Sequence, residues 1–268
     1  MPNPSEDNLP IELVPLDAPA PPRLPGEVFV RPDYDSVIDA VLADLFLHAV
    51  NCVRAFGDFH LAAAPTPGVE PVLRRLLYDL NYRDFPWTKT RVWMTHEVLH
   101  PTREPLGDGL HELVVEQSGM PPAQFHRIAP APQPASAPSQ APELAKRYAA
   151  TLREHLEWRE RGQDRLDVCL MDLSHDGPAL GFQRTPESDE DLVAWRMDPS
   201  ADSASVTLAL RTVNASRLIA LSAIGREAGK ALRAALTDRA SPLRLLRPLG
   251  GELRWYLDYE ACRAAAGE

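Results

Sequence analysis

Short apolar runs alternate along this chain with stretches whose apolar residues are spaced as in amphipathic helices. In the first such stretch, 34–56, apolar side chains recur every three or four residues, which predicts a helix with one buried face. The run 166–173 is apolar almost throughout, as expected of a central strand buried on both faces. This alternation predicts an α/β fold in a single domain: a mainly parallel sheet with helices on both faces, in a Rossmann-like three-layer arrangement.

The remaining segments extend the same alternation. Strands are expected at 27–30, 59–64, 91–95, 205–210, 217–223 and 255–257, and helices at 69–80, 108–118, 143–161, 212–215 and 227–236. In sheets of this kind, ligands bind where the carboxyl ends of strands run into loops. The loops after Leu61, Thr95 and Leu173 are therefore the ones expected to carry a site.

Proline accounts for 27 of the 268 residues and concentrates in two segments. Residues 1–23 lack hydrophobic periodicity, so we expect a flexible N-terminal arm there and the α/β domain over 24–268. Within that domain, residues 129–142 are almost entirely Ala, Pro, Ser and Gln. Because this composition offers little to bury, we expect the segment to be an exposed excursion.

The net charge and the cysteine content indicate which partners and which cellular compartment to expect. The formal net charge of −10 repels a phosphate backbone, so nucleic acid is not an expected partner. Residues 1–20 contain no Lys or Arg, and nowhere do eighteen apolar residues follow one another, so we expect neither export nor membrane insertion. Three widely separated cysteines favour reduced thiols and a cytoplasmic location. The oligomeric state is left open.

An ordered set of motifs carries a resemblance to a known family. Its members are Leu-Ala-Ala-Ala-Pro-Thr-Pro at 61–67, Asp-Val-Cys-Leu-Met-Asp-Leu-Ser-His-Asp-Gly-Pro at 167–178, Val-Thr-Leu at 206–208 with Val-Asn-Ala at 213–215, and Trp-Tyr-Leu-Asp at 255–258. The first two resemble Leu-Ser-Gly-Gly-Ser-Thr-Pro and Asp-Leu-Val-Leu-Leu-Gly-Met-Gly-X-Asp-Gly-His of the 6-phosphogluconolactonase branch of the glucosamine-6-phosphate isomerase superfamily. The resemblance extends over nearly all of the chain after the arm.

The resemblance implies a hydrolase of carbohydrate metabolism. The family reaction is hydrolysis of 6-phosphogluconolactone in the pentose phosphate pathway, with a sugar phosphate as small-molecule partner and no cofactor. The resemblance also implies that the substrate phosphate lies on the loop that contains Ala63, Ala64 and Thr66, with Gly177 and Lys230 as further binding residues. In the family, a His that follows Asp-Gly takes the proton of the attacking water.

This chain departs from the family at those positions. Pro178 stands in place of the His and has neither a titratable group nor an N–H, so it cannot act as a base. Residues 62–65 replace two serines and two glycines, which removes backbone freedom and one N–H donor. We therefore expect a pseudoenzyme, with impaired or lost catalysis and a sugar-phosphate-binding or regulatory function.

An active sugar-ester hydrolase remains the alternative. His175 beside Asp176, His96 or Glu97 could supply a substitute base, because an imidazole titrates near neutral pH and a carboxylate can accept a proton. The residues retained from the family pattern also have simpler explanations: Thr66 as a helix cap, Asp176 with Gly177 as a turn, and Lys230 as a solvated side chain.

A metal hydrolase is a second alternative. Residues 96–100 read His-Glu-Val-Leu-His, the H-E-x-x-H pattern in which two His on one helical turn bind zinc. The pattern requires a helix, yet here it follows a predicted strand and precedes Pro101. We therefore expect no metal.

Overall fold

The computed structural model describes residues 18–130, 137–157, 159, 164–173, 191–239 and 241–268. In this part of the chain, seven strands form one sheet in the order β1-β10-β9-β6-β2-β3-β5, and all neighbouring strands are parallel. The strands are β1 (Glu27–Arg31), β2 (Phe59–Ala63), β3 (Thr90–Met94), β5 (Phe125–His126), β6 (Val168–Asp172), β9 (Leu218–Ala223) and β10 (Glu252–Asp258). The prediction of a mainly parallel sheet is confirmed.

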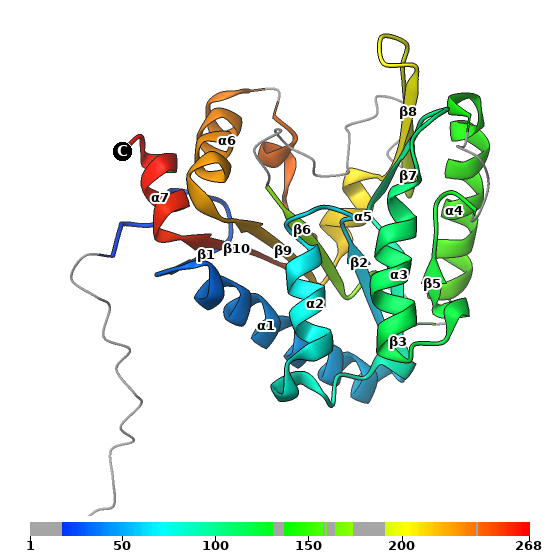
Figure 1. Ribbon diagram of the computed structural model, residues 1–268, viewed down its shortest axis with the longest axis horizontal. Helices are drawn as coiled ribbons and strands as arrows, with labels where there is room; N and C mark the ends of the chain where they lie inside the picture. The colour runs from blue at the N-terminus through cyan, green and yellow to red at the C-terminus, as the bar shows by residue number, and fades with distance from the viewer. Residues whose placement is uncertain (1–17, 131–136, 158, 160–163, 174–190, 240) are drawn as a thin grey trace, which may run out of the picture.

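Helices flank this sheet on both faces, which gives the three layers expected from the sequence (Figure 1). They are α1 (Tyr34–Phe56), α2 (Glu70–Tyr78), α3 (Leu106–Ser118), α4 (Ala141–Leu156), α5 (Leu210–Ala215), α6 (Gly225–Thr237) and α7 (Tyr259–Ala266). The central strands β2, β6 and β9 are buried over their whole length, so the core lies between the helical layers and the middle of the sheet.

The long helix α1 shows how local sequence sets an element and its burial. Asp33 caps its first turn by accepting the N–H of Ser36 at 2.8 Å, and Gly57 ends it with φ 88°, in the left-handed region. By length and composition alone, α1 could cross a membrane. Its apolar stripe, which includes Ile38 and Leu42, is instead fully buried in the domain core, as in the core helix of a globular protein.

A second, smaller sheet was not predicted from the sequence. It consists of β4 (His96–Leu99), β8 (Ser203–Leu208) and β7 (Val193–Asp198), with β8 in the middle and both pairs antiparallel. β4 follows β3 after a single residue, Thr95, whose carbonyl accepts the N–H of Leu208 at 2.8 Å. The small sheet therefore lies directly beyond the carboxyl end of β3.

The two proline-rich segments lie only partly within the described residues. Of the predicted N-terminal arm, residues 18–23 are described, and Ala20 contacts the domain through its carbonyl, 3.2 Å from Cys262 Sγ. Of the predicted excursion, Ala129 and Pro138 are buried. Residues 137, 139 and 140 are exposed, and 131–136 lie outside the described residues, so the exposed excursion stays a prediction.

A buried charge network ties the amino ends of the central strands together. Asp167 is fully buried and accepts hydrogen bonds from Arg159 at 2.9 and 3.0 Å, from Arg217 Nε at 2.9 Å and from the His60 N–H at 2.7 Å. Arg159 also reaches Asp58 at 2.7 Å. Because every carboxylate oxygen here has a cationic or N–H partner, the network can be buried without leaving an unpaired charge.

Candidate functional site

The strands β2, β3 and β6, whose following loops were singled out from the sequence, end at one edge of the parallel sheet. Ala63 at the end of β2 pairs with Met94 of β3 on one side and with Leu170 of β6 on the other. Beyond these pairs, the N–H of Thr95 donates to the Ala63 carbonyl at 3.1 Å. The structure thus places the carboxyl ends of β2, β3 and β6 at the same edge, where ligands of such sheets bind. Residues 174–190, which follow β6, lie outside the described residues.

The loop after β2 has few donors to offer an anion. The N–H of Ala64 donates to the Leu170 carbonyl at 3.0 Å, and the N–H of Thr66 donates to the Ala64 carbonyl at 2.9 Å. Pro65 and Pro67 have no N–H. A phosphate cradle requires several N–H groups that point away from the protein. Residues 64–67 therefore lack the donors that the resemblance implies, and Ala63 is committed to the strand.

The side chain of Thr66 is also engaged, by a residue that the sequence analysis missed. Its hydroxyl donates to a carboxylate oxygen of Asp172, at the end of β6, and both side chains are buried. Burial raises the pKa of Asp172, against the opposing effect of the Thr66 hydrogen bond. The signal was present in the sequence: position 172 is Asp where the family pattern has Gly.

Gly68 completes this arrangement at the entry to α2. A Cβ atom at position 68 would collide with the carboxylate of Asp172. The backbone of the loop therefore passes directly against the Asp172 side chain, and only glycine allows this approach. The volume next to the start of α2 is filled by a carboxylate of the protein itself.

Glu97 lies next to this site but acts on a helix. Its carboxylate is 1% exposed and accepts N–H bonds from Leu106 at 2.9 Å, Gly107 at 3.0 Å and Val98 at 2.9 Å. Burial raises the pKa of Glu97, while these three N–H groups oppose the shift. Both oxygens are thus held by the first turn of α3 and by β4. The geometry supports a capping function for Glu97 rather than the base suggested from the sequence.

His96 is buried and stays neutral near pH 7. Its Nδ1 lies 3.1 Å from Thr95 Oγ1, and burial lowers its pKa to about 4. An imidazole with so low a pKa is a weak general base at neutral pH.

The metal interpretation of residues 96–100 is wrong. His96 starts strand β4, and His100 lies just past its end, so the two side chains do not share a helical turn. Across the described ranges, no cluster of three or more His, Cys, Asp or Glu side chains is arranged to hold a metal ion.

The other candidate residues lie apart from this edge or outside the described chain. Lys230 is exposed on α6 and pairs with Glu227, one turn earlier, at 2.6 Å. This supports the simpler explanation of a solvated helix face. His175, Asp176 and Gly177, with Pro178, lie outside the described residues, so their functions remain predictions.

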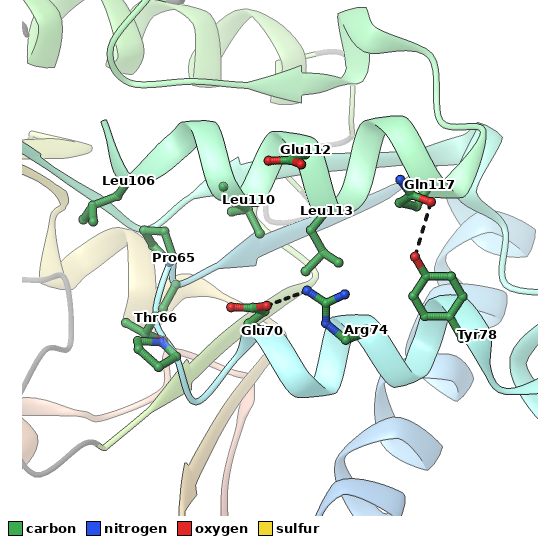
Figure 2. A pocket seen from close by; sticks show the side chains of 13 residues that line it. Pro65, Thr66, Glu70, Arg74, Tyr78, Leu106, Leu110, Glu112, Leu113 and Gln117 are labelled. Carbon is green, nitrogen blue, oxygen red and sulfur yellow. Dashed lines mark hydrogen bonds and ion pairs between the residues drawn. The ribbon is translucent and has the colours of Figure 1, made fainter. Parts of the chain in front are cut away.

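A cavity of about 450 Å³ runs from the loop after β2 along the groove between α2 and α3 (Figure 2). Apolar side chains of α3, among them Leu110 and Leu113, form one wall. On the α2 side, Arg74 pairs with Glu70 at 2.6 Å. The cavity therefore combines apolar walls with a charge pair that is already internally neutralised.

Known proteins match this chain over most of its length. The profile of the family described as "Glucosamine-6-phosphate isomerases/6-phosphogluconolactonase" matches residues 32–255. The "GDH/6PGL endoplasmic bifunctional protein" of Homo sapiens is 26% identical over an alignment of 279 positions, which covers 94% of this chain and 33% of that protein. The protein of the same name from Oryctolagus cuniculus is 24% identical over 243 positions, covering 85% and 29%. This chain spans about a third of the length of these curated relatives.

Solved structures show the same architecture. The "devB protein" superposes with a TM-score of 0.70 at 18% identity, covering 90% of this chain and 98% of that one. The 6-phosphogluconolactonases of Thermotoga maritima and Trypanosoma brucei each superpose with a TM-score of 0.65, at 16% and 18% identity, over 87% and 90% of this chain and 99% of theirs. At such low identity these likenesses establish the fold alone.

Proposed function

The chain belongs to the glucosamine-6-phosphate isomerase/6-phosphogluconolactonase family, and from this premise we propose that it binds a sugar derivative at the carboxyl edge of its sheet and hydrolyses 6-phosphogluconolactone weakly or not at all. One observation carries the proposal: the two titratable side chains of the β3–β4 segment are unsuited to activating water. Glu97 has both oxygens bound to N–H groups, and burial lowers the pKa of His96 to about 4.

Hydrolysis of a lactone needs a base that takes a proton from the attacking water. A base is most effective when its pKa lies near the working pH and it lies within hydrogen-bond reach of that water. His96 fails the first requirement, and Glu97 is tied to α3. Pro178 stands where the family has its His. Because these residues are poorly suited to hydrolysis, the function we propose is sugar binding or regulation in carbohydrate metabolism.

The competing function is an active sugar-ester hydrolase that uses His175 as a substitute base. We propose to separate the two by the rate of 6-phosphogluconolactone hydrolysis above the spontaneous rate, in the wild type, His175→Ala and His96→Asn. His100→Ala is the matched control, because it removes a histidine from the same segment as His96 but past the end of β4. We expect no protein-dependent hydrolysis in any of the four. Hydrolysis that His175→Ala or His96→Asn abolishes and His100→Ala preserves would overturn the proposal.

The proposed cellular setting is the cytoplasm. The three cysteines, Cys52, Cys169 and Cys262, are all buried as free thiols. Burial raises the pKa of the Cys52 and Cys169 thiols to about 12, so neither is poised for redox chemistry. The observation that supports a reducing compartment is that all three cysteines are free thiols. The proposed partner is a small molecule, without nucleic acid.

A further inference from the structure

The amino end of α2 points toward the loop after β2, and helix amino ends attract anions because their first N–H groups and their dipole carry partial positive charge. In this chain, protein carboxylates already lie there. Asp172 is held by the Thr66 hydroxyl and lies against Gly68, just before the helix. Glu70 is the first residue of α2.

The charged side chains near the loop do not offset the negative charge of Asp172. The one cation on the α2 side of the adjoining cavity, within the described residues, is Arg74, and it pairs with Glu70. Both of these side chains are more than half exposed, so solvent screens them. Asp172 is only 4% exposed, and its charge is screened much less. Among the residues that the structure describes, the charges nearest this loop therefore oppose a second anion.

We infer that Asp172 is a specificity-determining residue: its carboxylate occupies the place of an anion at the start of α2, excludes phosphate from this loop, and restricts the site to ligands that carry no phosphate there. The inference rests on the proposed function, which places a sugar derivative at this edge. The chemical class that suits it is an uncharged, hydroxylated sugar, because such a ligand brings no second negative charge beside the buried Asp172 carboxylate.

The test is a gain of phosphate binding when the carboxylate is removed. Asp172→Asn keeps the shape of the side chain and removes its charge, and Asp172→Gly also empties the space. Glu112→Gln is the matched control, because Glu112 is an exposed carboxylate on α3 that lines the same cavity. The dissociation constant of inorganic phosphate is measured from the rise in melting temperature with phosphate concentration, against chloride at equal ionic strength.

We expect no phosphate-specific rise for the wild type and for Glu112→Gln. For Asp172→Gly we expect at least about tenfold tighter phosphate binding, at the amino end of α2 rather than on residues 64–67, with a smaller gain for Asp172→Asn. Phosphate binding by the wild type would overturn the inference, and so would two folded Asp172 variants that gain nothing. Parallel titrations with glucose test the proposed function separately. If glucose fails to bind while the phosphate results hold, the sugar-binding proposal fails and the assignment of Asp172 stands.

Discussion

At the scale of single residues, two carboxylates dominate the carboxyl edge, and each is held by donors of the protein. Glu97 accepts three N–H groups, and Asp172 accepts the hydroxyl of Thr66. Donors that serve internal acceptors are not available to a ligand. The change from the family pattern at Asp172 and Glu97 is therefore a change in how this edge uses its hydrogen bonds.

Replacing Glu97 tests its capping function. Glu97→Gln removes the negative charge that favours the amino end of α3. It also replaces one carboxylate oxygen, which accepts a backbone N–H, with an NH₂ group that cannot accept it. We expect a loss of about 1–2 kcal/mol in the free energy of unfolding, measured by urea denaturation. The exposed Glu112→Gln on the same helix should change it by no more than about 0.5 kcal/mol. Equal stabilities of the two variants would contradict the capping function.

Asp172 also makes a prediction about pH. Because burial raises the pKa of Asp172, the folded protein holds the proton of this acid more tightly than the unfolded chain does. The stabilising contribution is therefore complete below the unfolded pKa of about 3.9 and is lost as pH rises through the higher folded pKa. The free energy of unfolding of Asp172→Asn, relative to wild type, should thus rise from pH 4 to pH 7 in urea titrations. A relative stability that falls over this range would contradict the assignment.

Part of this site was predictable from residue types. Pro65 and Pro67 show directly that two N–H donors are missing from the loop after β2. The loss of the usual base at Pro178 stays a prediction, because that residue lies outside the described ranges. The bond between Thr66 and Asp172 joins residues 106 positions apart, so it depends on the register of β2 against β6, which the sequence alone does not specify. The capping of α3 by Glu97 likewise depends on the path of the intervening loop.

At the scale of elements, the sequence was most informative where a strand or helix is buried. The predicted helix 34–56 agrees with α1, and the apolar run 166–173 contains β6. β4 and β7 were missed because neither has the required pattern. β4 begins with two polar residues, and β7 is exposed from Trp195 onward. Such strands are held by antiparallel pairing to β8, a tertiary interaction that overrides weak local propensity.

The entry into α2 yields a prediction at this scale. Gly68→Ala should destabilise the protein by about 1–3 kcal/mol, because its Cβ would collide with the Asp172 carboxylate and the loop would have to shift. Gly109→Ala is the control: it lies within α3 with no atom near an added Cβ, and should stabilise by about 0.5–1 kcal/mol.

A double-mutant cycle isolates the contact. In the Asp172→Gly background the space beside position 68 is empty, so the cost of Gly68→Ala should fall by more than half. Urea denaturation of the four proteins measures this coupling. An undiminished cost would show that the collision lies elsewhere in the loop.

At the scale of the whole molecule, the two edges of the sheet differ in character. The amino edge holds the paired network around Asp167, while the carboxyl edge holds the altered loops. Beside the network, Trp93 stacks on His126 at 3.8 Å between ring centroids and donates from Nε1 to His60 at 3.1 Å. Buried imidazoles thus extend from the amino edge toward the middle of the sheet.

His126 and His96 should make the fold sensitive to acid. Burial lowers the pKa of His126 to about 3 and that of His96 to about 4, whereas an unfolded His titrates near about 6.5. The unfolded state therefore binds more protons in this window, and stability is lost as pH falls below about 6.5. His126→Phe should reduce the slope of unfolding free energy against pH by up to about 1.4 kcal/mol per unit between pH 6 and pH 4. Unchanged slopes in urea titrations would contradict this account.

The central claim is that this chain keeps the family fold without the family's hydrolytic site, and lactone turnover by the wild-type protein tests it most directly. Formation of 6-phosphogluconate is followed at increasing protein concentration, with the spontaneous hydrolysis of the lactone subtracted. We predict a rate that depends little or not at all on protein concentration. A rate that rises in proportion to protein, saturates with lactone and reaches a kcat/KM of about 10⁴ M⁻¹s⁻¹ or more, as for an ordinary enzyme, would contradict the claim, because it would require an effective base at this edge that deprotonates water at neutral pH.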